Sequence, residues 1–560
     1  NGVDNSTLTL NSASLSVTGN MTWDGAGSSA LSIGAGSTLN LTGAAASHTL
    51  TDGIEITGGG QVNLSGTLDA NANTINITGA NSTFQLGSGG TGGAINTSSA
   101  VTIGSGGTFV INQSDTVTQG TEFGNSISGA GSIEQAGTGT TTLNVANSHT
   151  GGTTLSSGTL VLGDAAAAGT GAMTLSGGTL EMAANIANDI SAVGSTTIVN
   201  NTGTLQLSVG SVTGTGTLAF SVANQTRLFS DLSGFSGTIS HDNDAGGQLR
   251  LWNQPTDLSG TKIVTSGGTS GGGLQFIGGN DHTIGELSGT GGTILMRGGN
   301  GLTLTVDQST DTTYSGLLQD GDANRIGTLV KDGSGTLTLN FANTYTGTTT
   351  VDTGTLIIDG IQSSATGAMT INVNGTLAGS GTIGASLLTV NGVIAPGNSP
   401  GTLATGSQLW NDGGSYLWEI NASNDAGGTI GTDPGWDWLD ITGSLDLSLL
   451  SAGGFTIDID SLTSGNIAGD AVGFDTWTKG NPGDVDYSFI IATVSGGVTD
   501  FSADKFSFDS SGFSNAPGWD WQIILSGGDL VLEAYAVPEP SSTALLGLGG
   551  LALMLRRKRS

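Results

Sequence analysis

The chain is dominated by short runs in which apolar and polar residues alternate. Leu39 and Leu41, like Val62 and Leu64, stand two residues apart with a polar residue between them. A period of two places successive side chains on opposite faces of a β-strand, so each run predicts a strand with one apolar face. The runs end at Gly-Gly, Gly-Ser-Gly or Asn-Gly turns, and no stretch sustains a 3.6-residue period. The pattern predicts an all-β protein.

Strands this short cannot bury an apolar face alone. Coiling them into rungs about 4.8 Å apart pairs their backbones and stacks their apolar faces, which predicts a right-handed parallel β-helix. Glycine supplies 99 of the 560 residues and suits corners that require positive φ. The alternative is a disordered Gly/Ser/Thr linker, but disordered chains lack regular alternation of Leu, Val and Ile.

One stretch of the chain is duplicated. Gly139–Leu160 and Gly335–Leu356 align without a gap, with 14 of 22 positions identical, and the same offset matches 170–174 to 366–370. Both stretches resemble the autotransporter-associated β-strand repeat, with its Gly-Thr-Leu-Thr-Leu, Asn-Thr-Tyr-Thr-Gly and Gly-Thr-Leu signatures. The second copy matches better, because His149 stands where the second copy has Tyr345. Residues 395–403 resemble the Pro-Gly-Asn-Ser-Pro-Gly-Thr-Leu segment that often follows the last repeat.

The C-terminal 24 residues have the layout of a membrane-targeting signal. An uncharged stretch, Thr543–Leu555, lies between a short motif and a basic end. Basic residues beside an apolar segment stay on the cytoplasmic side, which predicts that the preceding chain lies outside the inner membrane. The motif is Val537, Pro538, Glu539 and Pro540, and the basic stop is Arg556, Arg557, Lys558 and Arg559.

These residues resemble the PEP-CTERM sorting signal. The resemblance implies a short membrane helix, recognition by a membrane transpeptidase called exosortase, and release to the cell surface or extracellular matrix. Thirteen residues span about 20 Å as a helix, less than a bilayer core of about 30 Å, so the anchor is expected to be weak and transient. The alternative is a tail helix packed on a soluble domain. Residue 1 is Asn, so an N-terminal export signal is expected to have been removed or left out.

The charge balance restricts the partners. The chain has 12 basic and 44 acidic residues, a net charge of −32, and no Lys or Arg before Arg227. Nucleic acid is excluded as a partner, since phosphate binding needs clustered cations. An acidic polysaccharide is expected to be repelled unless a divalent cation bridges it. Without cysteine, the chain has no disulfide, thiol chemistry or cysteine-based metal site.

Composition divides the chain into four predicted segments. Residues 1–130 form N-terminal solenoid rungs, 131–402 the β-helix with the repeats, 403–536 a Trp-rich C-terminal β region, and 537–560 the sorting signal. Seven of nine tryptophans lie between Trp410 and Trp521, and Pro-Gly-Trp-Asp-Trp occurs twice. The pairs could stack on sugar rings, although burial in the core is the favoured alternative. The candidate glycan-stacking residues are Trp436, Trp438, Trp519 and Trp521.

No catalytic residue is assigned. Gly397–Gly401 matches G-x-S-x-G, but every histidine precedes Ser399, against the order of that motif. Asp320, Asp322 and Asn324 begin like an EF-hand loop, but Arg325 replaces the required glycine, so only a weak calcium site is expected. No other metal or cofactor is expected. Of the cations that a polysaccharide lyase would use as a base, the body offers only Arg227, Arg250, Lys262, Arg297, Arg325, Lys331, Lys479 and Lys505.

The sequence therefore favours an exported, surface-associated β-solenoid with a structural or adhesive role and no enzymatic activity. Its expected partners are the exosortase, the inner membrane before processing, and an exopolysaccharide or matrix. The alternatives are a polysaccharide-active lyase or glycosidase on the same scaffold, and a passive spacer without a ligand.

Overall fold

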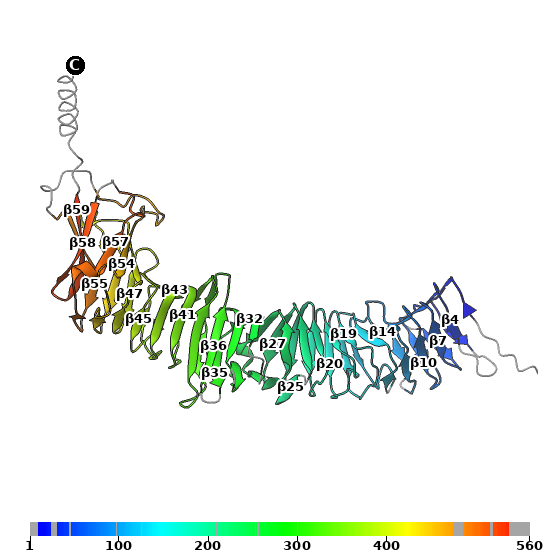
Figure 1. Ribbon diagram of the computed structural model, residues 1–560. Coiled ribbons are helices and arrows are strands. Elements are labelled where there is room, and N and C mark those ends of the chain that lie inside the picture. The colour runs from blue at the N-terminus through cyan, green and yellow to red at the C-terminus, as the bar shows by residue number, and fades with distance from the viewer. Residues whose placement is uncertain are drawn as a thin grey trace, which may run out of the picture. The chain divides into compact units, whose positions relative to one another are not determined.

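The protein is built from short β-strands, as the computed structural model shows (Figure 1). Within the described residues the helices are three 3-10 turns, η1 (Asn243–Ala245), η2 (Asn424–Ala426) and η3 (Ala503–Lys505). None of the helices in these ranges has the length and apolar character needed to cross a membrane. The described residues are 9–23, 31–43, 46–96, 98–124, 126–207, 210–252, 254, 257–270, 272–279, 281–298, 301–474, 485–515 and 519–536.

The chain divides into two compact units. The first unit comprises Asn1–Leu304 and Ser315–Ile326, and the second comprises Thr305–Tyr314 and Gly327–Ser560. The boundary falls within β36 (Leu302–Asp307).

The first unit is a parallel β-solenoid, which confirms the predicted fold class. Each sheet takes strands from successive turns of the chain, and neighbouring strands pair in parallel. In Figure 1 these strands follow one another as a stack of similar turns. One sheet contains β1 (Thr9–Leu10), β4 (Leu31–Ile33), β7 (Ile54–Thr57), β10 (Ile75–Thr78), β13 (Val101–Ile103) and β16 (Ile127–Ser128). The longest sheet confined to this unit contains β2 (Ser14–Val17), β5 (Thr38–Leu41), β8 (Gln61–Leu64), β11 (Thr83–Leu86), β14 (Thr108–Ile111), β17 (Ser132–Gln135), β19 (Thr153–Leu155), β21 (Met173–Leu175), β23 (Ile190–Ala192), β26 (Ser211–Gly214) and β29 (Asp231–Phe235).

The remaining strands of the first unit complete the turns. A small sheet contains β3 (Met21–Trp23), β6 (Ser47–Leu50), β9 (Thr67–Asp69) and β12 (Ala94–Ile95). Another contains β25 (Leu205–Leu207), β28 (Thr226–Leu228), β31 (Leu249–Trp252), β33 (Leu274–Gly278), β35 (Thr293–Gly298) and β38 (Leu317–Asp320). A further row contains β15 (Thr116–Thr118), β18 (Thr140–Leu143), β20 (Thr159–Leu162), β22 (Thr179–Met182), β24 (Ser195–Asn200), β27 (Thr217–Val222), β30 (Thr238–Asp242), β32 (Asp257–Ser266) and β34 (His282–Gly289).

The alternating pattern points apolar residues into the solenoid. Leu39, Val62, Phe84 and Phe109 pair in register on four successive strands, and all four side chains are fully buried. The rings of Phe84 and Phe109 lie 5.9 Å apart. Polar residues one position later form an outer ladder, in which the Asn63 amide donates to Asn40 at 2.8 Å. Like side chains therefore stack on like, and backbone groups pair between turns.

The second unit continues the same parallel pairing and then changes it. One row contains β37 (Thr312–Tyr314), β39 (Gly327–Asp332), β40 (Thr336–Leu339), β41 (Thr349–Ile358), β43 (Met369–Gly379), β45 (Leu388–Val390), β46 (Val393–Pro396), β48 (Gln408–Trp410), β49 (Ser415–Ile420), β50 (Thr429–Ile430), β51 (Gly435–Trp436), β53 (Leu445–Asp446), β54 (Phe455–Ser461), β56 (Val498–Thr499) and β57 (Phe506–Asp509). A seven-stranded sheet contains β42 (Ile361–Gln362), β44 (Thr382–Ile383), β47 (Thr402–Thr405), β52 (Trp438–Ile441), β55 (Tyr487–Val494), β59 (Asp529–Ala536) and β58 (Trp519–Ser526).

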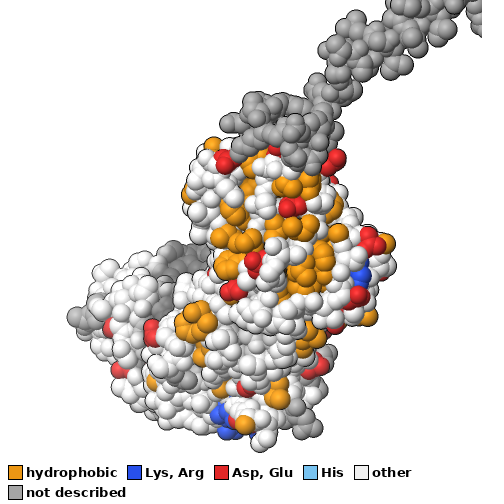
Figure 2. Space-filling model, turned by 90° about the vertical axis from the view of Figure 1, so that its left-hand side faces the viewer, with side chains coloured by type: hydrophobic (Ala, Val, Ile, Leu, Met, Phe, Trp, Pro, Cys, Tyr) orange, Lys and Arg blue, Asp and Glu red, His pale blue; other side chains and the backbone are white. Residues whose placement is uncertain are grey.

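The last strands of the second unit pair in the antiparallel direction. β59 pairs antiparallel with both β55 and β58, whereas β52 still pairs parallel with β55. A hairpin at this edge ends the stack of parallel turns, as the terminal repeat of a solenoid must. Figure 2 shows apolar side chains gathering on one face of this unit, whose exposed apolar residues include Val485 and Leu525.

Candidate functional site

The first predicted tryptophan pair lies in the second unit and spans two strands. Trp436 ends β51 and is only 6% exposed. Its indole N–H donates to the carbonyl of Ile490 at 3.0 Å, and its ring centroid lies 5.1 Å from that of Phe489. Trp438 begins β52, is half-buried, and donates to the Thr493 hydroxyl at 3.3 Å. The ring of Trp436 is therefore buried against other side chains of the protein and is not open for stacking on a sugar.

The second pair stands two residues apart on β58, which puts both side chains on one face of the strand. The ring of Trp519 lies 5.4 Å from Tyr487 and 6.0 Å from Phe474. The ring of Trp521 lies 5.2 Å from Phe513 and 6.4 Å from Trp418. Both side chains are half-buried and face an aromatic cluster, so intramolecular packing occupies much of the surface that a sugar ring would need.

The predicted calcium loop is held partly by its own arginine. Asp322 forms an ion pair with Arg325 at 3.2 Å and accepts the backbone N–H of Asn324 at 3.0 Å. Asp320 ends β38, one residue before the turn that carries these groups. Over the described ranges, no three His, Asp or Glu side chains form a group suited to a metal ion.

Carboxylates form a second cluster, beside the segment that follows the last repeat. Asp437 is buried and accepts the backbone N–H groups of Gly401 at 2.7 Å and Glu419 at 3.0 Å. The Ser399 hydroxyl donates to the Glu419 carboxylate. Glu419 pairs in register with Asp460 on β54. Acids therefore fix the Pro-Gly-Asn-Ser-Pro-Gly turn, and the hydroxyl of the G-x-S-x-G serine is bound to a carboxylate.

The surroundings raise the pKa of several acids in this region. Burial, and then the neighbouring Glu419, raise the pKa of Asp437 well above its usual value, although the two N–H donors oppose the shift. Burial also raises the pKa of Glu419. On the next strand, burial followed by the charges of Asp460 and Asp509 raises the pKa of Asp458 to about 6.

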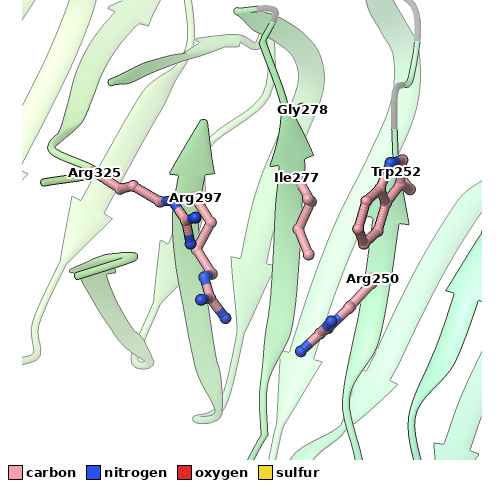
Figure 3. Close-up of a pocket in the computed structure, with 6 residues that line it drawn as sticks. All are labelled: Arg250, Trp252, Ile277, Gly278, Arg297 and Arg325. Atoms are coloured by element: carbon pink, nitrogen blue, oxygen red, sulfur yellow. The ribbon is translucent and has the colours of Figure 1, made fainter. Parts of the chain in front are cut away.

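Cations gather in the first unit, on the sheet that contains β28, β31, β33 and β35. Arg227 on β28 pairs in register with Arg250 on β31. Trp252, two residues after Arg250, pairs with Ile277 on β33, which in turn pairs with Arg297 on β35. Arg325 reaches the same place from the turn after β38. A pocket of about 290 Å³ is lined by Arg250, Trp252, Ile277, Gly278, Arg297 and Arg325 (Figure 3). We call it the arginine pocket.

Neutral groups hold Arg250 and Arg297 of this pocket and the adjacent Arg227, whereas Arg325 is paired with Asp322. Arg227 donates to the Gln225 side-chain oxygen at 2.7 Å, and Arg250 donates to that of Gln248 at 2.7 and 3.0 Å. Arg297 donates to Gln275 at 3.4 Å. Within the part of the chain that the structure describes, these three arginines form no ion pair with a carboxylate.

The pocket also has an aromatic wall. The Arg227 guanidinium lies 5.5 Å from the centre of the Trp252 ring, and the same ring stacks on Phe229 at 5.4 Å. Figure 3 shows Arg325 pointing toward Arg297, with Ile277 beside the Trp252 ring. Burial, then the charges of Arg297 and Arg227, lower the pKa of Arg250. Like charges are therefore concentrated around a partly apolar floor.

No local sequence pattern marks this pocket as a site. Arg227, Arg250, Arg297 and Arg325 stand in separate segments of the chain, and the group of seven tryptophans lies beyond residue 403, away from Trp252. The available signal was that Arg227 and Arg250 lie about one turn of the solenoid apart and that Trp252 follows at the next outward position.

The predicted sorting residues lie outside the described residues. These are Val537, Pro538, Glu539, Pro540, Arg556, Arg557, Lys558 and Arg559, together with the expected membrane helix between them.

Comparison with known families agrees with the repeats seen in the chain. The passenger-associated-transport-repeat family matches residues 133–162 and 157–182, and again residues 329–358 and 352–378. These ranges contain both copies of the duplicated stretch and lie on successive strands from β17 to β22 and from β39 to β43. Each match is therefore a piece of the solenoid stack.

The PEP-CTERM protein-sorting motif matches residues 536–559. Among curated proteins, no relative matches the chain. The motif and the repeats indicate an exported protein. The chain is thus a parallel β-solenoid that carries passenger-associated-transport repeats and ends in a PEP-CTERM sorting motif.

Proposed function

We propose that the protein is a structural or adhesive element of the cell surface or extracellular matrix. The observation that carries this proposal is the joint presence of a C-terminal sorting motif and a stacked β-solenoid. A solenoid offers a long, regular outer surface on which many weak contacts add up. Here that surface is polar, with ladders such as Ser16, Asn40 and Asn63 along one sheet.

The sorting motif supplies the route to that location. It implies processing by an exosortase, with the C-terminal segment held in the inner membrane until the chain is cut. Four basic residues at the end would keep that terminus on the cytoplasmic side. Arg556, Arg557, Lys558 and Arg559 are the residues to change.

Surface display and processing can be measured in the cells that make the protein. We expect antibodies to label intact cells, and intact mass to show a chain that ends before Thr543. Replacing the four basic residues with serine should leave unprocessed protein in the cell. Recovery of the mature protein with Ser560 as its last residue would contradict processing, and exclusively cytoplasmic protein would contradict the proposed function.

An enzyme on the same scaffold is the second candidate, and the three carboxylates of Glu419, Asp437 and Asp460 near Ser399 favour it. Glycosidases use two carboxyl groups, one of them with a raised pKa. The backbone donors on Asp437, however, suit a group that fixes the turn. Two assays on uronans and neutral glycans test this candidate, one for reducing sugars and one for unsaturated products. If the protein turns over such a substrate and Glu419→Gln abolishes the activity, the enzymatic function would replace the structural or adhesive one.

A spacer without a ligand is the third candidate. Cells that lack the protein should lose retention of labelled matrix polysaccharide if the role is adhesive. Unchanged retention, with the protein present on the surface of wild-type cells, would favour a spacer.

A further inference from the structure

We propose that the arginine pocket binds a carboxylated sugar unit of an acidic polysaccharide. The inference deepens the proposed adhesive role by naming a site and a ligand class, and it rests on that role for its biological setting.

The distribution of cations is the first reason. The chain has four arginines before its C-terminal five residues and 44 acidic residues in all. Three of these arginines, Arg250, Arg297 and Arg325, line the pocket, and Arg227 lies beside it as the register partner of Arg250. Arg325 is paired with Asp322, whereas Arg227, Arg250 and Arg297 form no ion pair with a carboxylate among the described residues. Arg227 and Arg250 instead sit directly opposite each other, an arrangement of like charges that destabilises a sheet. A bound anion would relieve that repulsion.

The hydrogen bonding is the second reason. Arg227, Arg250 and Arg297 have glutamine oxygens as their side-chain partners, which fix the guanidinium groups without neutralising them. Each guanidinium carries five N–H donors in a planar fork, more than these contacts use. A carboxylate matches that fork with two parallel hydrogen bonds. The side chains are therefore held in place for an acceptor that carries charge.

The apolar wall selects the ligand class. Trp252 is held by Phe229 and Arg227, and Ile277 lies beside it in register. An aromatic ring next to guanidinium groups suits a ligand that has an apolar ring face and a carboxylate on the same unit, as a uronic acid has. The volume of about 290 Å³ lies at the lower end of small-molecule sites, about 300–1,000 Å³, so it suits a single unit of a longer chain.

The acidic remainder of the chain argues against nucleic acid. Duplex DNA carries one charge for about each 1.7 Å of its axis and needs an extended row of cations. The pocket offers a few cations at one place, whereas the first 226 residues of the same solenoid have none. A polyuronate carries its carboxylates further apart than duplex DNA carries its phosphates. One pocket can therefore hold one sugar unit while the neighbouring units of the polysaccharide remain in solvent.

The test uses the purified full-length chain in mild detergent and isothermal titration calorimetry. The probes are oligogalacturonate, a neutral malto-oligosaccharide of equal length, inorganic phosphate and a single-stranded oligonucleotide. We expect oligogalacturonate to bind, also in the presence of EDTA, and the other probes to bind at least tenfold more weakly. The double variant Arg250→Gln/Arg297→Gln and the variant Trp252→Leu should each weaken oligogalacturonate binding at least tenfold. Lys262→Gln is the matched control, because Lys262 is an exposed cation on β32 that is paired with Glu286, and it should bind like the wild type.

Several results would overturn the pocket assignment. These are no binding of oligogalacturonate, binding that EDTA abolishes, equal binding of the neutral sugar, phosphate or the oligonucleotide, or pocket variants that bind like the wild type. Circular dichroism and thermal melting show whether each variant is folded. If the double variant Arg250→Gln/Arg297→Gln does not fold, the single variant Arg250→Lys replaces it. Cell-surface labelling reports separately on the proposed function: a displayed protein that fails to bind refutes only the pocket, and a cytoplasmic protein that binds refutes only the surface role.

Discussion

At the residue scale, the two copies of the repeat fill equivalent positions with different chemistry. His149 and Tyr345 are both buried, and each bonds the threonine four residues later, at 3.0 Å for Thr153 and 2.7 Å for Thr349. Gln135 and Lys331 are also equivalent, and each donates to the backbone carbonyl of the glycine two residues later, Gly137 and Gly333 respectively. The repeat thus conserves a hydrogen-bonding task rather than a residue type.

Lys331 tests this equivalence. Its ammonium group is buried and donates to the carbonyls of Asp332 at 2.7 Å, Gly333 at 2.8 Å and Thr353 at 3.3 Å. Lys331→Met leaves those carbonyls without their donor and should destabilise the second unit by about 2–4 kcal/mol. Lys331→Gln should cost less than half of that, because the first copy uses glutamine there. Urea unfolding of the three proteins measures the difference, and equal losses for both variants would contradict the equivalence.

His149 gives the first unit a pH dependence. Burial lowers its pKa from 6.5 to about 4. The unfolded chain therefore binds a proton more readily, so stability is complete above pH 6.5 and is lost as the pH falls toward 4. At about 1.4 kcal/mol for each pH unit, the loss is about 3 kcal/mol.

His149→Tyr, the residue of the second copy, should remove this loss. We expect the melting temperature of the variant to fall less than that of the wild type between pH 7.5 and 4.5. His241, whose pKa burial also lowers to about 4, stays in both proteins as an internal reference. Identical decreases in the two proteins would show that His149 does not titrate on unfolding.

At the element scale, turns and strand pairing explain the family signature. The glycine of Gly-Thr-Leu has a φ of 65° at Gly158 and 66° at Gly354. A side chain at Gly158 would overlap the carbonyl oxygens of Gly137 and Gly139 in the turn below. Glycine is therefore required both by the conformation and by the closeness of adjacent turns.

Gly158→Ala should destabilise the first unit by about 2–4 kcal/mol, because it combines a strained φ with a backbone clash. Gly90→Ala is the control, since no atom lies within 4 Å of a side chain placed there. Thermal unfolding monitored by circular dichroism compares them. A melting temperature for Gly158→Ala as high as that of Gly90→Ala would mean that the turn can rearrange.

The acidic ladder across β54 and β57 should respond to pH in the opposite direction. The pKa of Asp458 is raised to about 6, first by burial and then by Asp460 and Asp509, so its charge destabilises the folded state above pH 6. That penalty falls as the pH drops from 6 toward 4. Asp458→Asn should therefore raise the melting temperature at pH 7.5 and change it little at pH 4.5. Asp446 is the control: its carboxylate accepts a backbone N–H from Ser448, which lowers its pKa, so its replacement by Asn should give no gain. A variant no more stable than the wild type at pH 7.5 would contradict the shifted titration.

At the scale of the whole molecule, net charge and local charge act in opposite directions. The chain carries −32, which repels a polyanion at long range, whereas the arginine pocket attracts it at short range. Screening at about 0.15 M salt restricts the repulsion to about 8 Å and leaves close contacts partly intact.

Association with a polyuronate should therefore accelerate as salt increases. We expect the association rate constant to rise several-fold between 10 and 150 mM NaCl in surface plasmon resonance, while dissociation also quickens. A rate constant that falls with salt would indicate attraction over the whole surface and contradict the balance of charges described here.

The sequence determined the local geometry of this protein. Alternation assigned the strands and their inward faces, as at Val62 and Phe84, and the duplicated signatures showed that turns repeat. The C-terminal motif was also readable directly, because a short motif, an apolar stretch and a basic end are contiguous in the chain. These features depend on neighbours within a few residues.

Only the tertiary structure decided which distant side chains meet. Arg227, Arg250, Arg297 and Trp252 come together because the lengths of the intervening turns bring their strands into one register. A change of one residue in any turn would move them to the opposite face. Turn lengths vary along the chain, so the register is set by the packing and pairing of all the turns together, and no local pattern records it.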